Sequence, residues 1–585
     1  MIRPALLALL LAAPTAAEPP APVGARVADF TLPDPSTGKP WALAEQTRGA
    51  KATVVVFLAT GCPVNNAYLP RLAELHKQFA KDGAVFVGVN SHPADDPAAV
   101  ARHAKEHAIP FPVLKDDRAK LAGQLAVERV PTVFVLDAGR VVRYKGRIDD
   151  QFSPGLHRAK ATTRELQQAV AAVLGGREVA TPFAAPAGCK LTREREPVAA
   201  AEPVTYHKHV SRIVQEKCQD CHRPGEAAPF ALLTYKQARG WADMIREVVE
   251  AGQMPPWHAD APPGHFANDR RLSAEQKKTI LAWVDQGCPE GDPKDAPPPR
   301  AFKEGWRLGR EPDVVLTMNK PVDVPAQYLY GLAGMPYQYV PVGEPFKEDT
   351  WVQAAEVRPD FRSALHHVIA FVVPPGQTIM DVAGEDFGRH MLAAYVPGDQ
   401  PVVYPEGLAK LVPKGSQIVF ELHYTPNGKA GRDRSSIGLV LAKKPPQMAA
   451  TTDAIFTEKF AIPPGADGHV VKAARTYDRP VTLIALTPHM HLRGKSFRYE
   501  LVTPDGKREV LLNVPRWDFN WQVSYLLAKP RALLAGSRIE CTAWYDNSAA
   551  NPVNPDPTAR VRWGNMTWEE MMIGFVEYME ERPAK

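Results

Sequence analysis

The chain has 585 residues, which is too long for one hydrophobic core and predicts roughly three to five domains. Hydrophobic residues make up 45% and charged residues 23%, a composition that excludes a chain disordered throughout. The net charge of +5 arises from 70 basic and 65 acidic residues without a basic run, so we expect no nucleic-acid partner.

The N-terminus has the pattern of a secretory signal. Arg3 precedes an apolar run from Ala5 to Ala13, and small residues follow as far as Ala17. This order predicts a signal peptide over residues 1–17 with cleavage near Ala17. The run is far shorter than the ~20 residues that span a bilayer, and no later stretch is long enough. We therefore expect a periplasmic or secreted protein with no membrane span.

Residues 25–178 alternate strands with helices and predict an α/β domain. Strands are expected over 51–60 and 84–90, helices over 67–83 and 98–108, and a hairpin over 132–148. Cys62 lies between the first strand and the first helix. Because the N-terminus of a helix lowers the pKa of a thiol, a reactive cysteine would lie at this position.

The stretch FLATGCPVNNAYLPRL, together with Val130-Pro131-Thr132 before a later strand, resembles the thioredoxin/redoxin superfamily. Folds of this superfamily carry a cis-proline just before this later strand, facing the active site, and Pro131 occupies that place. The sequence departs from the pattern, since Asn65 occupies the second cysteine position and Ala59 replaces the threonine of peroxiredoxins. Cys62 either pairs with Cys189 or is a free thiol without catalysis, and the sequence leaves both open.

A proline- and alanine-rich stretch over 179–203 predicts a linker, and 204–292 is mostly helical. Within it, KCQDCHRPG places Cys218, Cys221 and His222 at the C-x-x-C-H spacing of covalent c-type haem. The two thiols reach the vinyl groups and the histidine binds the iron. A zinc site lacks the second cysteine pair it would need. We therefore expect an all-α cytochrome c domain with one covalent haem c.

The sixth iron ligand should be a soft or imidazole donor further along the chain. Met254, in AGQMPPWHAD, resembles the distal methionine of small c-type cytochromes, and the two prolines after it would hold its loop rigid. His258 is the alternative ligand, and Met254 would then be an ordinary core methionine.

After a second linker at 293–309, the chain predicts short antiparallel strands in two sandwiches, over 310–447 and 448–583. Histidines recur along these strands, as His366-His367, as His423, and as His489 and His491 on either side of one methionine. Adjacent histidines in a regular strand point to opposite faces, so one metal can bind both only at a bulge or after reorientation of a ring.

The order of these motifs, followed by the Glu-Glu-Met of TWEEMMIGFVEYM, resembles the copper type II, ascorbate-dependent monooxygenases. This is the family of peptidylglycine α-hydroxylating and dopamine β-monooxygenases, whose fold is two jelly-roll sandwiches with one copper on each. The resemblance implies an electron-storing copper at His366, His367 and His423, and an oxygen-binding copper at His489, His491 and Met571. Met572 would replace Met571 if the strand register differed by one residue.

The resemblance implies a monooxygenase that hydroxylates a C–H bond of a small-molecule substrate with O2 and takes electrons from an external donor. We expect the haem domain to feed the two coppers. A glycine-extended peptide is not expected as substrate, because Thr487, Ile573 and Phe575 replace residues that the peptide-hydroxylating members use, and Glu421 replaces a glutamine.

Two other functions remain open. The chain could be a copper and electron-transfer protein with a thioredoxin-like module that hydroxylates nothing, or the redoxin domain could be its working part. Cys288 and Cys541 are expected to be buried free thiols.

Overall fold

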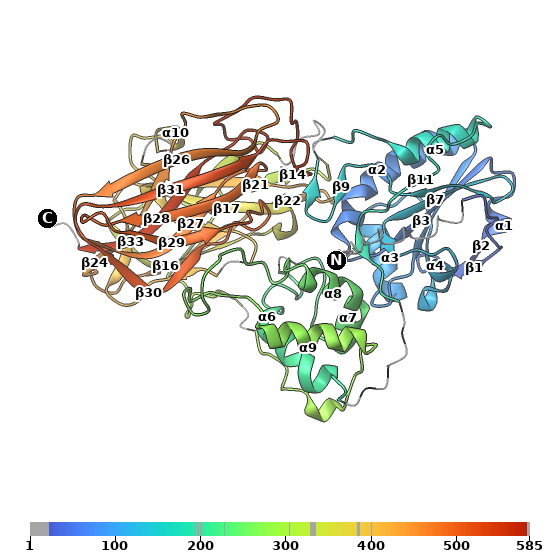
Figure 1. The fold of residues 1–585 in the computed structure, drawn as a ribbon, viewed down its shortest axis with the longest axis horizontal. Helices are drawn as coiled ribbons and strands as arrows, with labels where there is room; N and C mark the ends of the chain where they lie inside the picture. Colours follow the sequence, from blue (N-terminus) through green and yellow to red (C-terminus); the bar gives the residue numbers. More distant parts are fainter. Residues whose placement is uncertain are drawn as a thin grey trace, which may run out of the picture.

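The computed structural model describes residues 23–581 apart from 159, 194, 196, 197, 199, 201, 227, 303, 304, 328–334, 383–385 and 399. The predicted signal peptide falls outside the described residues. Figure 1 shows an α/β domain at one end of the molecule, two β-sandwiches at the other, and a helical region beside them. Within the described ranges, every helix is too short or too polar to cross a membrane.

The α/β domain is built on a six-stranded sheet with the order β11-β8-β7-β3-β4-β5. Its strands are β3 (Ala52–Leu58), β4 (Ala84–Asn90), β5 (Val113–Lys115), β7 (Thr132–Asp137), β8 (Val142–Gly146) and β11 (Phe183–Ala184). Its helices are α1 (Leu43–Gln46), α2 (Pro63–Phe79), α3 (Pro97–Glu106), α4 (Lys120–Gln124) and α5 (Glu165–Leu174). Short strands pair as β1 (Thr31–Pro33) with β2 (Pro40–Ala42), and as β9 (Phe152–Ser153) with β10 (Leu156–His157).

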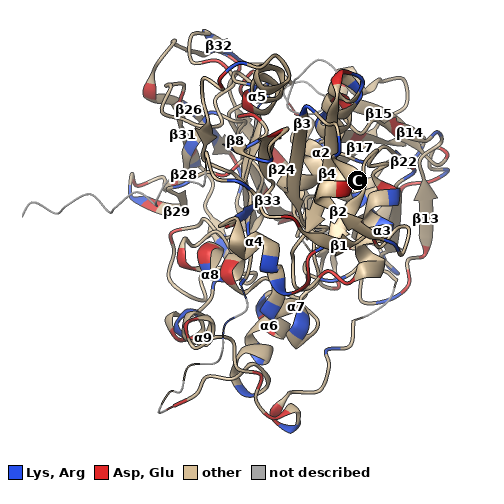
Figure 2. Ribbon diagram, turned by 90° about the vertical axis from the view of Figure 1, so that its right-hand side faces the viewer, with Lys and Arg blue, Asp and Glu red and all other residues tan. Residues whose placement is uncertain are grey.

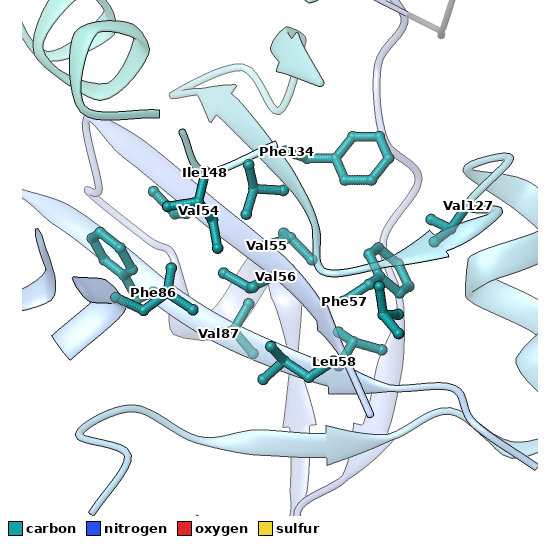
Figure 3. Close-up of a cluster of buried hydrophobic side chains, with 14 of the residues drawn as sticks. Val54, Val55, Val56, Phe57, Leu58, Phe86, Val87, Val127, Phe134 and Ile148 are labelled. Carbon is teal, nitrogen blue, oxygen red and sulfur yellow. The ribbon is translucent and has the colours of Figure 1, made fainter. Parts of the chain in front are cut away.

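The apolar run of β3 explains its central place in this sheet. All seven of its residues are buried, and it pairs parallel to β4 and antiparallel to β7. Figure 3 shows the side chains of β3 packed with Phe86, Phe134 and Ile148 in the core of the domain. A strand buried on both faces needs a continuous apolar sequence, and TVVVFL supplies it.

The segment expected as a linker over 179–203 contributes two strands to this domain. β11 pairs parallel to β8, and β12 (Cys189–Lys190) pairs antiparallel to β6 (Arg129–Val130). The close approach of β11 depends on a glycine, because a Cβ on Gly146 would lie 2.3 Å from the carbonyl oxygen of Ala184. Sequence composition indicated a linker, but the unpaired edges of the sheet bind this segment through its backbone.

The helical region comprises η3 (Tyr206–Val210), α6 (Ser211–Lys217), α7 (Tyr235–Gly240), α8 (Ala242–Glu250), α9 (Ala274–Asp285) and η4 (Pro293–Asp295). Helices α7 and α8 are separated at Trp241, which is buried in the core of the α/β domain. Gly240 permits this contact, since a Cβ there would lie 2.6 Å from the Cβ of Ala94. Helix α9 begins at a capping box formed by Ser273 and Gln276.

The remaining chain is a large all-β region in which the two sandwiches share one sheet. This nine-stranded sheet contains β13 (Val314–Thr317), β16 (Thr350–Arg358), β19 (Val402–Val403), β20 (Leu408–Val412), β23 (Ser436–Leu441), β24 (Met448–Phe456), β27 (Val481–His489), β30 (Tyr525–Leu533) and β33 (Ile573–Glu581). The two halves join where β20 pairs parallel to β24. We expected two separate sandwiches, and the backbone pairing of these two strands makes them continuous.

Each half of the shared sheet is covered by a four-stranded sheet. The first cover contains β15 (Gln338–Val342), β17 (Leu365–Val373), β18 (Met391–Tyr395) and β21 (Gln417–Tyr424). The second contains β26 (Asp467–Tyr477), β28 (Gly494–Val502), β29 (Arg508–Val514) and β31 (Ser537–Asp546). The smaller elements are β14 (Val322–Val324), β22 (Gly431–Asp433), β25 (Ala461–Ile462), β32 (Val561–Arg562), α10 (Ile379–Val382), η5 (Arg362–Ala364) and η6 (Phe387–His390). A separate apolar core fills each sandwich.

Charged residues of both signs are mixed along each region. Figure 2 shows lysine and arginine interspersed with aspartate and glutamate over the helices and the strand ends. This distribution agrees with the nearly balanced totals of 70 basic and 65 acidic residues.

Candidate functional site

Three histidines from neighbouring strands form a compact cluster on the first sandwich. His366 and His367 belong to β17, and His423 lies on β21 directly opposite His367. Their ring centroids are 5.0 to 5.2 Å apart. One nitrogen of each ring lies within 4.8 Å of the other two, which is close enough for one metal ion.

A β-bulge brings the two adjacent histidines together. The pairing of β17 with β21 shifts register between Leu365 and His367, so the residue between them, His366, is the extra one. Leu365 packs in the core of the sandwich, whereas His367 faces away from it, and the Nδ1 atoms of His366 and His367 lie 3.0 Å apart. Adjacent residues of a regular strand point to opposite faces, but the bulge allows His366 and His367 to point toward one site.

A second pair of histidines lies on the other sandwich. His489 ends β27 and His491 follows in the turn, so the strand expected through both residues is shorter than predicted. Their ring centroids are 5.3 Å apart. His489 Nδ1 lies 2.5 Å from Oε1 of Gln522, and His491 Nδ1 donates a hydrogen bond of 3.2 Å to the carbonyl oxygen of Glu569. Both rings therefore keep Nε2 for another partner.

The two methionines that follow occupy different faces of the shared sheet. Met572 is fully buried in the core of the second sandwich. Met571 packs instead with Ile573 and Phe575, and Ile573 pairs in register with His489. Because directly paired residues share a face, Met571 lies on the side of the sheet that carries His489.

The two histidine groups approach each other across one aromatic ring. Phe519 stacks on His366 with a centroid distance of 4.7 Å and an interplanar angle of 13°. The same ring lies 6.3 Å from His491. Phe519 and Gln522 belong to one loop of the second sandwich, so a single segment contacts both groups. Sequence reasoning missed these two residues, because no motif in the loop marks them.

A buried carboxylate supports the turn that holds His491. Glu570 accepts backbone hydrogen bonds from His491 at 2.9 Å and from Arg493 at 2.6 Å. Burial raises the pKa of Glu570 to about 8, while these two N–H groups and the buried Arg493 guanidinium oppose that rise. The sequence signal for this residue was the Glu569-Glu570 pair before Met571.

A cavity of about 390 Å³ opens beside His366. Its wall includes residues of both sandwiches, among them Leu365, Leu492 and Trp517, and two residues of the α/β domain, Pro63 and Gly155. Such a site, mostly apolar with a few polar groups, is typical of small-molecule pockets.

The predicted haem segment begins directly after α6. Cys218 and Cys221 are free thiols, and burial raises the pKa of Cys218 to about 12. His222 Nδ1 lies 3.1 Å from the carbonyl oxygen of Phe230, which orients the ring and leaves Nε2 for a ligand. Met254 is half-buried after α8. His258 is buried, and neither of its ring nitrogens has a hydrogen-bond partner among the described residues.

Cys62 and Cys189 form a disulfide, which is one of the two alternatives left open by the sequence. Cys62 caps the N-terminus of α2, and Cys189 on β12 pairs with Val130. The peptide bond between Val130 and Pro131 is cis, and Cys62 Sγ lies 3.4 Å from the Val130 carbonyl oxygen. Cys288 and Cys541 are buried free thiols.

Comparison with known proteins agrees with this N-terminal geometry. Residues 23–145 match the model of the AhpC/TSA family. The N-terminal domain is a thioredoxin-like redoxin module. No curated protein matches the chain.

Solved structures that match the chain include a hypothetical protein from Sinorhizobium meliloti, at 32% identity over 29% of this chain and 92% of that one, with a TM-score of 0.27. An uncharacterized conserved protein from Geobacillus kaustophilus matches at 25% identity over 30% and 94%, with a TM-score of 0.27. Peroxidoxin BcpB from Mycobacterium tuberculosis matches at 24% identity over 26% and 95%, with a TM-score of 0.21.

The buried histidines predict that the metal-free chain loses stability in mild acid. Burial lowers the pKa of His489 to about 4 and of His491 to about 3, and it lowers the pKa values of His367 and His423 well below the usual range. In the unfolded chain the pKa of each of these imidazoles is ~6.5. Below that pH the unfolded state binds more protons than the folded state, so the free energy of unfolding decreases as pH falls toward 4.

The expected decrease in melting temperature of the metal-free chain is about 5 °C or more between pH 7 and pH 5. The raised pKa values of Glu570, about 8, and Glu421, about 7, act in the opposite direction. Burial also lowers the pKa values of His92 and His103 to about 4, and these two groups add to the decrease. His423→Phe, which replaces one buried imidazole by an apolar ring, should reduce the decrease. An unchanged melting temperature over this range would contradict the prediction.

Proposed function

We propose that the chain is an exported copper- and haem-dependent monooxygenase that hydroxylates a C–H bond of a small molecule with O2. The observation that carries the proposal is the convergence of two histidine groups from two sandwiches on one aromatic ring, Phe519. Neither group alone distinguishes a metal site from a polar patch. Together they supply two sets of imidazole donors on either side of Phe519, which with His366 lines the cavity.

The types of donor support copper at both positions. Nδ1 of His423 and Nε2 of His491 are buried without a hydrogen-bond partner among the described residues, and a buried polar atom of this kind is costly unless something binds it. His366, His367 and His423 would hold one copper, and His489, His491 and Met571 the other. Imidazoles suit both copper oxidation states and the thioether favours the reduced one. Copper at such donors supplies the one-electron chemistry that activates O2.

The surrounding residues orient these donors. Gln522 and the Glu569 carbonyl hold the Nδ1 atoms of His489 and His491, which leaves both Nε2 atoms for a metal. Phe519 lies between the two groups, with its ring stacked on His366 and 6.3 Å from the ring of His491. The cavity beside His366 would hold the substrate, and its wall combines apolar groups with polar and charged ones such as Arg362, Asp518 and Asn520.

The residues around the C-x-x-C-H motif fit a covalent haem, which supplies one-electron transfer. Two free thiols and an oriented histidine are present, and Met254 is the proposed sixth ligand, with His258 as the alternative. The helical region contacts both sandwiches. Glu226 pairs with Arg362 of the first, and Phe266 bridges to Leu527 of the second. This tether keeps the haem segment near the proposed coppers at high effective concentration.

Elemental analysis of chain exported together with haem-attachment machinery tests the proposal. We expect about two coppers and one iron per chain. Oxygen consumption with small C–H substrates then separates a monooxygenase from a copper and electron-transfer protein that hydroxylates nothing. One iron with little copper, even after loading, would refute the monooxygenase. The mass of the mature N-terminus would test export and cleavage near Ala17.

A further inference from the structure

The disulfide of the redoxin module is covered by the helical region of the same chain. Cys62 is fully buried and Cys189 is 4% exposed. A Cβ on Gly61, the residue before Cys62, would lie 2.9 Å from the ring of Trp241 and 3.2 Å from the Cβ of Phe230. The face beside Cys62 is therefore covered by the helical region that carries the C-x-x-C-H motif.

Stacked rings connect this face to the C-x-x-C-H motif. Trp241 and Phe230 stack at a centroid distance of 4.0 Å with an interplanar angle of 11°. The Phe230 ring lies 4.8 Å from the ring of His222, and its carbonyl oxygen contacts His222 Nδ1 at 3.1 Å. Trp241 and Phe230 thus connect Gly61, the residue before Cys62, to the predicted iron ligand His222.

We propose that the Cys62–Cys189 pair is the electron entry of the chain: it accepts electrons from an external dithiol and passes them through Trp241 and Phe230 to the haem segment. This inference rests on the haem part of the proposed function and is independent of the copper part. It identifies the reductant of the chain as a dithiol. The histidine sites do not indicate which reductant the chain uses.

Thiol–disulfide exchange with the external dithiol reduces the Cys62–Cys189 pair. A thiolate of the external dithiol attacks Sγ of Cys189, the new S–S bond forms, and the bond to Cys62 breaks. Cys62 leaves as a thiolate at the N-terminus of α2, a 17-residue helix whose dipole stabilises the negative charge. The second external thiol then displaces Cys189. The products are an external disulfide and two protein thiols.

Cys189 is the sulfur that we expect the external thiolate to attack. It is on a two-residue strand, and its neighbour Lys190 lines a cavity of about 560 Å³ at the surface.

The electrons then leave the pair one at a time. Re-forming the disulfide from two thiols releases two electrons and two protons. Each electron would pass to the haem that Cys218, Cys221 and His222 would hold, and the protons would pass to solvent. A chain with one haem would complete the oxidation in two successive one-electron steps, and an external one-electron acceptor would reoxidise the haem between them.

A spectroscopic test needs neither copper nor substrate. The haem-loaded chain, ferric and free of oxygen and copper, is mixed with tris(2-carboxyethyl)phosphine, which cleaves the disulfide. Haem absorbance gives the rate of reduction, and alkylation with mass spectrometry gives the thiols at Cys62 and Cys189. We expect haem reduction to follow thiol formation, and Cys189→Ser to abolish it.

Three aromatic variants test the route. Trp241→Leu and Phe230→Leu should each slow haem reduction about tenfold or more at an unchanged yield of thiols, and Trp241→Phe should restore most of the rate. Trp306→Leu is the matched control, because Trp306 packs on Gly438 of the first sandwich, and it should leave the rate unchanged. Should one leucine variant fail to fold, the other gives the same comparison.

Haem reduction at the wild-type rate in Cys189→Ser, or in both leucine variants, would overturn the inference while leaving the proposed haem intact. A chain that never acquires haem would overturn both. Absence of copper or of oxygen consumption would refute the monooxygenase and leave the electron entry standing.

Discussion

His423→Ala should remove one copper from the loaded chain and lower the hydroxylation rate by about 100-fold or more. His423 lies directly opposite His367 and completes the group of three imidazoles whose nitrogens are within 4.8 Å of one another. Two remaining ligands bind copper more weakly than three. Elemental analysis and oxygen consumption measure the two effects, and the copper at the other histidine pair should remain.

His469→Ala is the matched control for this substitution. His469 lies on β26 of the second sandwich and belongs to no group of potential metal ligands within the described ranges. It should retain about two coppers and the full rate. Retention of both coppers by His423→Ala would show that the cluster on the first sandwich is not a copper site.

Glu570→Ala should lower the free energy of unfolding of the metal-free chain by about 3–5 kcal/mol. Glu570 is fully buried, and its carboxylate accepts the N–H groups of His491 and Arg493. Its removal leaves these two buried backbone donors unsatisfied. The turn that orients His491 would loosen, so copper affinity at the second site should also fall, by about 10–100-fold.

Urea unfolding and copper titration measure these two effects. Glu570→Gln keeps an acceptor of the same shape and should lose less stability than the alanine variant. Glu509→Ala is the control, because its carboxylate is exposed in a surface pair with Arg531, and it should change stability by less than about 1 kcal/mol. Equal losses for Glu570→Ala and Glu509→Ala would refute the structural role of Glu570.

The redoxin module was predictable because its signals are local. A continuous apolar run such as β3 has few alternatives to a buried central strand, and the boundary between that strand and α2 placed Cys62 at a helix N-terminus. The histidines of the all-β region were recognisable for a similar reason. The order of these histidines along the chain does not depend on how the strands pair. The motifs therefore identified the residues without any knowledge of the distances between them.

Contacts between distant segments could not be predicted in this way. The bulge at His366 depends on the register of β17 against β21, and register is a property of two strands together. The place of Phe519 between the two histidine groups depends on how the sandwiches meet. The disulfide was undecided for the same reason, because Cys189 reaches Cys62 only when its segment pairs with the free edge of β6.

The sequence by itself therefore determined the order of the regions, the core strands of the redoxin module and the identity of the candidate ligands, since these depend on local pattern. The tertiary structure alone decided which ligands converge, that the predicted linker belongs to the redoxin module, and that Trp241 covers the disulfide. Those outcomes depend on backbone pairing and side-chain packing between residues far apart in the chain, and neither leaves a periodic signal in the sequence.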